Sequence, residues 1–217
     1  MSPALLKVAL VGYGYVGKTF HAPLIAATPG LELHTVVSSD PAKVRADFPE
    51  VAVVAADLIR ALADPAIDLV VIATPDSSHA DQAHAALAAG KHLVIDKPFA
   101  VTLEDARAVA AHAREVDRSV TVFHNRRWDS DFLTLQALID RGHLGEIVQY
   151  ESHFDRYRPL VRDRWREKPG AGALLDLGPH LIDQALVLFG KPEAIYADIA
   201  VQKDGGAAGD YFHLLLR

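Results

Sequence analysis

Asp176 and His180 could share one chemical task, because they stand four residues apart in a segment expected to be helical. At that spacing both side chains lie on one face of a helix, one turn apart. A neutral histidine can accept a hydroxyl proton near neutral pH, and a carboxylate can orient the histidine or hold a neighbouring hydroxyl. Pro179 is tolerated in a first helical turn, so the helix is expected to begin close to Asp176. From spacing alone, it stays open that Asp176 caps the helix and His180 is a packed histidine.

Lys97 is another candidate for chemistry. It follows the apolar run His92–Ile95 within Asp96-Lys97-Pro98, and in an open parallel sheet the carboxyl ends of the strands face the ligand crevice. There a lysine could stabilise a developing alkoxide and contact a nucleotide. Position alone leaves a surface lysine as the alternative. The neighbouring strand end and the helix after it supply further expected cofactor contacts: Thr74, Pro75 and His79.

The elements that must position these side chains begin with a glycine-rich turn, Gly12-Tyr13-Gly14-Tyr15-Val16-Gly17. It follows the first expected strand and opens the first expected helix, which is the setting of a dinucleotide-binding fingerprint. Gly12 would permit the tight turn, Gly14 the approach of a pyrophosphate, and Gly17 the packing of helix on strand. Helix N-terminal amides would face the phosphates. The alternative is a glycine-rich turn with no ligand.

The end of the second expected strand bears on which nicotinamide cofactor binds. NAD-selective folds usually place an acidic residue there, on the ribose 2′-hydroxyl. Here Ser38 and Ser39 occupy that position, with Lys43 and Arg45 close behind, which favours a 2′-phosphate and therefore NADP. Two alternatives keep NAD possible: Asp40 is itself the ribose acceptor, or it only caps the following helix.

The pattern of apolar runs predicts an α/β fold, a doubly wound parallel sheet of the Rossmann type. Apolar and β-branched runs predict strands, and Ala-rich amphipathic stretches predict the helices between them. The expected strands are Leu6–Val11, Leu31–Ser38, one beginning at Val53, Leu69–Ala73, His92–Ile95 and Val120–Phe123; the expected helices are Val16–Ala27, Leu58–Ala63, His79–Ala89 and Leu103–Val116.

After Phe123 the rhythm of the sequence changes. We therefore expect a nicotinamide-binding domain over 1–123, and over 124–217 the first part of an α+β domain with an antiparallel sheet. Its expected helices are Asp131–Arg141 and Leu174–Phe189, and its expected strands are Glu146–Phe154, Tyr196–Gln202 and Tyr211–Leu216. Since the last strand would keep an unpaired edge, we expect this domain to be incomplete and the chain to be truncated.

Composition narrows the partners. The 217 residues carry 22 basic and 28 acidic side chains, a net charge of −6 with no basic cluster, so nucleic acid is not expected as a partner. No apolar run is long enough to span a bilayer, and the N-terminus does not resemble a signal peptide, so we expect no membrane partner and a cytoplasmic location. Cysteine is absent, which excludes disulfides. The histidines show no spacing with carboxylates that suggests a metal site.

Two polar segments of the second half are expected to contact ligands. In 124–129 we expect Arg126 to reach the cofactor, and Asn125 and Trp128 to contact substrate, with domain-junction packing as the alternative. The run His153–Arg166 holds five arginines, His153, Tyr157 and Trp165. A substrate loop, with His153 as a contact, and an oligomer contact are both open.

Together these motifs resemble the Gfo/Idh/MocA oxidoreductase family. The likeness runs from Lys7 to Leu216, and its NRRWD segment is similar to the NADP-dependent scyllo-inositol dehydrogenase branch. Asp96 replaces the commoner glutamate of the Glu-Lys-Pro motif. The residues that carry the resemblance are Gly12-Tyr13-Gly14, Thr74-Pro75 with His79, Ala89-Gly90-Lys91-His92, Asp96-Lys97-Pro98, Phe123–Asp129 and Asp176-Leu177-Gly178-Pro179-His180.

The resemblance implies that Lys97, Asp176 and His180 form a catalytic group. It implies hydride transfer between a polyol or sugar-like hydroxyl and NADP, with His180 as the base. It also implies a homo-oligomer for the full-length family, while the oligomeric state of this chain stays open. Two alternatives remain: a relative acting on another substrate, such as an aldose or a dihydrodiol, and a nucleotide-binding sensor or truncated remnant without turnover.

Overall fold

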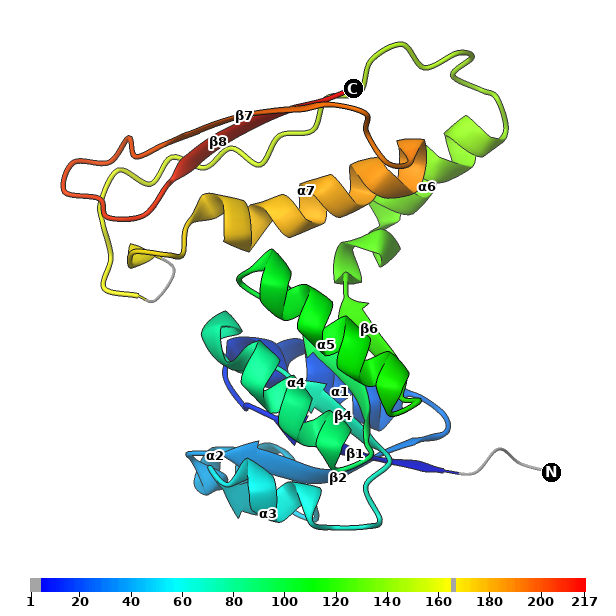
Figure 1. Cartoon of the computed structure of the whole chain (residues 1–217), viewed down its shortest axis with the longest axis vertical. Helices are drawn as coiled ribbons and strands as arrows, with labels where there is room; N and C mark the ends of the chain where they lie inside the picture. The colour runs from blue at the N-terminus through cyan, green and yellow to red at the C-terminus, as the bar shows by residue number, and fades with distance from the viewer. Residues whose placement is uncertain (1–4, 165–166) are drawn as a thin grey trace. The chain divides into compact units, whose positions relative to one another are not determined.

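The computed structural model describes residues 5–164 and 167–217, which divide into two units, Met1–Phe123 and His124–Arg217. The first unit is built on a six-stranded parallel sheet (Figure 1). The sheet has the order β3-β2-β1-β4-β5-β6, so the chain reverses direction across the sheet between β1 and β4. In such folds, ligands bind at the carboxyl edge beside this reversal. The strands are β1 (Leu6–Val11), β2 (Leu31–Ser38), β3 (Ala52–Ala55), β4 (Leu69–Ile72), β5 (His92–Asp96) and β6 (Val120–Phe123).

Both faces of this sheet are buried, which explains why its strands are apolar without interruption. Alternate residues of β1 point to opposite faces, so Ala9 and Val11 enter one core cluster and Val8 and Leu10 the other. Helices α3 (Leu58–Leu62), α4 (His79–Ala88) and α5 (Leu103–Glu115) contribute to the first cluster, and α1 (Ala22–Ala27) and α2 (Pro41–Asp47) to the second. The predicted α/β fold class is confirmed.

The helix after the glycine turn differs from the prediction. In place of a continuous α-helix over Val16–Ala27, a π-helical turn, η1 (Gly17–His21), precedes α1. Such a turn inserts an extra residue into the helical repeat. His21, at its end, is thereby placed among buried residues with 3% of its surface exposed.

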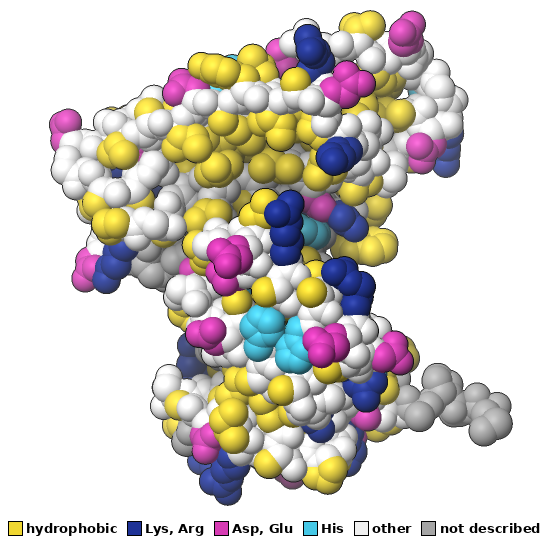
Figure 2. Space-filling model, viewed as in Figure 1, with side chains coloured by type: hydrophobic (Ala, Val, Ile, Leu, Met, Phe, Trp, Pro, Cys, Tyr) yellow, Lys and Arg dark blue, Asp and Glu magenta, His cyan; other side chains and the backbone are white. Residues whose placement is uncertain are grey.

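The second unit begins with a short 3-10 helix, η3 (Asn125–Trp128), and α6 (Ser130–Asp140). A long helix, α7 (Ala173–Phe189), then leads to an antiparallel hairpin of β7 (Ile195–Ala200) and β8 (Tyr211–Leu216). β7 ends before the predicted Gln202 because the amides of Gln202 and Lys203 donate to the Asp210 carboxylate instead of to a strand. Figure 2 shows hydrophobic side chains gathered over this unit; those exposed on and beside the hairpin are Ile195, Tyr196, Ile199, Val201, Leu215 and Leu216.

The strand predicted over Glu146–Phe154 is wrong. This segment forms no ladder with any described strand, since β7 and β8 pair with each other. An alternating pattern reports which side chains face a core, but a strand also needs a neighbouring backbone to share hydrogen bonds. The segment instead runs as an extended, mostly exposed trace (Figure 1).

Within the described residues, no helix is long and apolar enough to cross a membrane.

Candidate functional site

The glycine turn lies at the carboxyl edge of β1, and its three glycines meet different surroundings. Gly12 has φ +96°, and a Cβ there would lie 2.7 Å from the carbonyl oxygen of Ala73. A Cβ on Gly17 would lie 2.1 Å from the carbonyl oxygen of Gly12. These two glycines are therefore required by the packing of the turn itself. A Cβ on Gly14 would meet no described atom within 4 Å, so the fold leaves room for a side chain there.

Tyr13, the second residue of the turn, belongs to the core cluster that includes Val8 and Leu10. Its ring is 5% exposed, and its hydroxyl donates to Asp47 Oδ2 at 2.9 Å, an oxygen that Lys18 Nζ approaches to 2.7 Å. Burial, then the hydrogen bond and charge of Asp47, raise the pKa of Tyr13 to about 12. The hydrogen bonds from Lys18 and Tyr13 lower the pKa of Asp47. The side chain expected to contact the cofactor is thus committed to the core, whereas Tyr15, also expected there, is 74% exposed.

The polar side chains at the end of β2 differ in burial and in hydrogen bonding. Ser38 is buried, and its hydroxyl both donates to the carbonyl of Asp40 and accepts from its amide. Asp40 caps α2 by accepting from the amide of Lys43 at 3.2 Å. Ser39 and Lys43 have exposed side chains. Of the residues expected to hold a 2′-phosphate, Ser39 and Lys43 are therefore accessible, and the Ser38 hydroxyl is engaged locally.

The neighbouring strands β4 and β5 bring the expected Thr74, Pro75 and Lys97 to the same edge of the sheet. The Thr74 hydroxyl donates to Gln82 at 2.6 Å and accepts from Ser78 at 3.0 Å. Lys97, which is partly exposed, follows β5 directly and is joined to Pro98 by a cis peptide bond. His79 is 1% exposed, and its ring nitrogens face the carbonyl oxygens of Pro98 and Thr74.

A buried histidine at this edge was missed by sequence reasoning. The His21 Nε2 atom lies 3.8 Å from Asp96 Oδ1, and the ring centroids of His21 and Phe123 are 4.2 Å apart. Asp96 immediately precedes Lys97. A histidine on the apolar face of the first helix was the available signal, but an α-helical register does not locate a residue that ends a π-helical turn.

In the second unit, the candidate Asp176 and His180 lie on α7. The helix begins at Ala173, one residue before the predicted Leu174, because the amide of Ala173 donates to Gly209 and that of Asp176 to Gly172. Pro179 is consequently interior to the helix. His180 is 8% exposed. Asp176 is less deeply buried, and both residues belong to the first half of the helix.

The same helix carries buried polar groups one turn further on, at Asp183 and Gln184. Arg127 donates to both oxygens of Asp183, from Nε at 2.7 Å and Nη2 at 2.6 Å, and this hydrogen bonding raises the pKa of Arg127. Gln184 donates to the carbonyl of Arg126 at 3.0 Å. These contacts attach η3 to the helix that carries His180.

The remaining predicted residues of this unit are dispersed. Arg126 pairs with Asp129 at 2.8 Å and lies over the ring of Phe154, so its guanidinium already has partners within the unit. Asn125 is partly buried in η3, and Trp128 is 78% exposed. Trp165 and Arg166, in the polar run noted above, lie outside the described residues.

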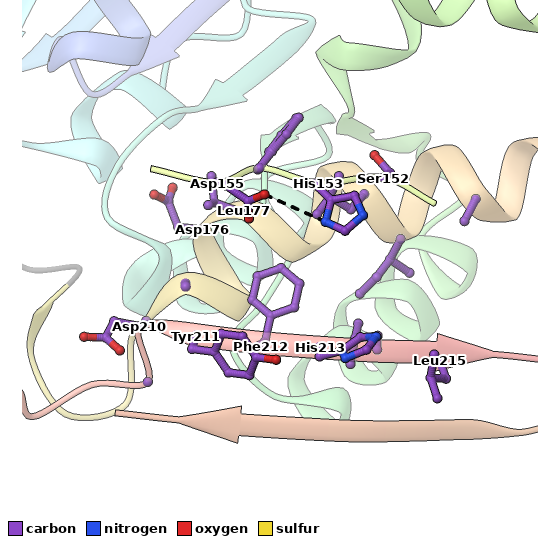
Figure 3. A pocket seen from close by; sticks show the side chains of 18 of the residues that line it. Ser152, His153, Asp155, Asp176, Leu177, Asp210, Tyr211, Phe212, His213 and Leu215 are labelled. Carbon is purple, nitrogen blue, oxygen red and sulfur yellow. Dashed lines mark ion pairs between the residues drawn. The ribbon is translucent and has the colours of Figure 1, made fainter. Parts of the chain in front are cut away.

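A cavity of about 1390 Å³ lies between α7, the extended segment that includes Ser152, His153 and Asp155, and β8. Asp176 and Leu177 of α7 line it, and Figure 3 shows the His153 ring beside Asp155. His153 Nδ1 lies 3.8 Å from Asp155 Oδ2. His180 is not among its lining residues. The cavity therefore brings Asp176 and His153 to one space, but it is larger than the roughly 300–1,000 Å³ usual for a small-molecule site. Among the described residues, no cluster of three His, Asp or Glu side chains is arranged to hold a metal.

Both parts of the chain match models of known protein families. Residues 6–124 match a family model described as an oxidoreductase family with an NAD-binding Rossmann fold, and residues 132–217 match the GFO/IDH/MocA C-terminal domain. The chain is 56% identical over 213 residues to the uncharacterized oxidoreductase YdgJ of Escherichia coli K12, a match that covers 97% of this chain and 61% of YdgJ.

Two further similarities come from Bacillus subtilis. IolW, named scyllo-inositol 2-dehydrogenase (NADP(+)), is 42% identical over 213 residues, which cover 97% of this chain and 59% of IolW. The solved structure of YvaA matches with a TM-score of 0.95 at 41% identity, covering 100% of this chain and 62% of that one. The chain thus spans about three fifths of the length of the curated relatives it matches.

Proposed function

Because the chain belongs to the GFO/IDH/MocA family of oxidoreductases, we propose that it serves an NADP-dependent dehydrogenase that oxidises a hydroxyl of an inositol-like polyol or sugar. The similarity to IolW supports this substrate class and this cofactor. The polar, hydrogen-bonding character of Lys97, Asp176 and His180 also suits a polyhydroxylated substrate.

The observation that carries cofactor binding is the contrast among the glycines of the turn. Packing explains Gly12 and Gly17, but within the described structure no neighbour explains the missing side chain at Gly14. A pyrophosphate approaching the turn backbone would need that space, and the amides of the following helical turn would face it. The residues present therefore fit a dinucleotide.

Ser39 and Lys43 support NADP over NAD. Both side chains are exposed at the end of β2, where a 2′-phosphate can accept a hydrogen bond from the hydroxyl and pair with the ammonium group. Asp40 accepts from the Lys43 amide through Oδ1 as the cap of α2, so one of its carboxylate oxygens is engaged within the chain. Lys18 forms an ion pair with Asp47 at 2.7 Å, so in our proposal Lys43 supplies the positive charge beside the 2′-phosphate.

The reaction we propose divides the task among three side chains. His180 accepts the proton of the substrate hydroxyl while the C–H bond of the carbon that carries this hydroxyl breaks. The electron pair of the broken O–H bond becomes the second bond of the new carbonyl group. Lys97 donates to the oxygen while it carries negative charge, and Asp176 orients His180 or holds a neighbouring hydroxyl. When bound, the nicotinamide supplies the acceptor for the hydride that leaves the carbon. His180 then releases its proton to solvent.

Fluorescence titration with NADPH and NADH, followed by an NADP-reduction assay with inositols, tests this function. We expect tighter binding of NADPH than of NADH and reduction of NADP by an inositol. Ser39→Asp should weaken NADPH binding at least about tenfold by repelling the 2′-phosphate, while Ser119→Asp, at an exposed serine before β6, serves as the matched control. No nucleotide binding would refute the proposal, and binding without turnover on any polyol would favour a nucleotide sensor.

A further inference from the structure

His79 joins the segments that follow two neighbouring strands. It is the first residue of α4, and its ring lies between the chain after β4 and the chain after β5. Nδ1 lies 2.8 Å from the carbonyl oxygen of Pro98, and Nε2 lies 3.0 Å from that of Thr74. With 1% of its surface exposed, the ring is enclosed by protein.

These contacts begin where the sheet stops. The ladder between β4 and β5 ends with Ile72 opposite Ile95, so the carbonyls of Thr74 and Pro98 lie beyond its last pair. A buried carbonyl needs a donor, and leaving one without a partner is costly. His79 places one nitrogen of a rigid ring against each carbonyl oxygen, which fixes the spacing between the two segments.

The Pro98 side of this link bears on the chemistry. Pro98 is the residue after Lys97, so holding its carbonyl restricts the backbone that carries the Lys97 side chain. The Thr74 side restricts the segment expected to contact the dinucleotide. A carbonyl oxygen only accepts hydrogen bonds, so a neutral His79 ring donates to one of the two carbonyls, and both contacts are hydrogen bonds only in the imidazolium form.

Resting on the function proposed above, we propose that His79 is a positioning residue: through Pro98 it holds Lys97 for turnover, and through Thr74 it holds the nucleotide-binding segment. It contacts neither substrate nor cofactor. The role separates into two halves, because each nitrogen serves a different segment.

Two substitutions test the halves separately. The amide nitrogen of Asn reaches about as far as Nδ1 of His, and that of Gln about as far as Nε2, so His79→Asn keeps a donor toward Pro98 and His79→Gln keeps one toward Thr74. We expect His79→Gln to lower kcat roughly 10- to 100-fold with little change in the Kd of NADPH, as a small displacement of a reacting group can. We expect His79→Asn to retain most of kcat and to weaken NADPH binding several-fold.

A matched control removes the effect of stability alone. Val109→Ala truncates a core residue of α5 that is 1% exposed and lies outside both segments, so it should lower the melting temperature and leave kcat and Kd in place. Equal losses of kcat in His79→Asn and His79→Gln, or losses matched by Val109→Ala at the same melting temperature, would overturn the proposal.

Hydrogen–deuterium exchange supplies a readout that requires neither cofactor nor turnover. In His79→Gln, amides of 96–101 should exchange faster while those of 73–78 stay protected, and His79→Asn should show the reverse. If the parent chain binds no NADPH yet exchange follows this pattern, the proposed function fails and the link itself stands. Uniform exchange changes in both variants would overturn the link.

Discussion

Arg127 donates to both carboxylate oxygens of Asp183 from one edge of its guanidinium, Nε at 2.7 Å and Nη2 at 2.6 Å, and so joins the start of the second unit to α7. Asp183 lies three residues after His180, and both are buried. A bidentate contact fixes orientation as well as distance. The helix register that presents His180 is therefore held from outside the helix.

Replacing Arg127 should lower the stability of the folded chain. Arg127→Ala leaves a buried carboxylate without its main partner, so we expect the free energy of unfolding to fall by about 2 kcal/mol, in the range for a hydrogen bond to a charged group. Urea unfolding measures the change. Arg107→Ala, at an exposed position of α5, is the control and should change stability by less than about 0.5 kcal/mol. Equal effects of the two substitutions would contradict the prediction.

The glycine turn predicts opposite outcomes for two alanine substitutions. Gly14→Ala has space in the fold and should leave the melting temperature unchanged while weakening NADPH binding at least about tenfold, because the methyl group blocks the pyrophosphate. Gly17→Ala would drive a methyl group into the Gly12 carbonyl and should destabilise the fold itself. Thermal unfolding with NADPH titration separates them. Unchanged NADPH affinity in Gly14→Ala would count against cofactor binding at this turn.

Tyr13 gives a pH-dependent prediction. Its pKa in the folded chain is about 12, above the ordinary value of 10.0, so the folded state holds the phenolic proton more tightly than the unfolded chain does. Its contribution to stability is complete below pH 10 and is lost as the pH rises toward 12. Tyr13→Phe should therefore flatten the fall in stability across this window. Denaturant unfolding at several alkaline pH values measures it, and an unchanged slope in Tyr13→Phe would refute the assignment.

The role proposed for His180 predicts that replacing it removes turnover without weakening cofactor binding. His180→Ala should lower kcat roughly 100- to 10,000-fold, the usual contribution of a general base, and should leave the Kd of NADPH unchanged. His143→Ala, at an exposed histidine after α6, is the control. Single-turnover rates with saturating NADP measure the effect. A variant that keeps kcat within about twofold would remove His180 from the reaction.

Much of the first unit was predictable because its signals are local. Uninterrupted apolar runs such as Leu69–Ile72 follow from burial on both faces, and the glycines at Gly12 and Gly17 mark a turn that only one backbone path allows. The residues of the carboxyl edge could be listed in advance, since parallel strands bring their ends together. These patterns predicted the α/β class that the structure confirms.

The errors arose where structure depends on distant partners. Glu146–Phe154 alternates like a strand, but the described chain offers it no ladder. Ala173 begins α7 because Gly209, far along the chain, accepts its amide hydrogen bond, and no local cap reports that contact. The commitments of Tyr13 to Asp47 and of His79 to two carbonyls likewise depend on tertiary packing. Spacing located these side chains without revealing what they bind.

The close packing of Gly12 and Gly17 has a consequence for how such turns drift over evolutionary time. A descendant that no longer needed a nucleotide would still be unable to replace either residue without disturbing the fold, so most of the fingerprint would outlive the activity. Gly14 would be the first of the three glycines to accept a side chain, because the fold leaves room for one there. A side chain appearing at that single position is therefore the earliest sign to look for when a member of such a lineage has turned into a scaffold.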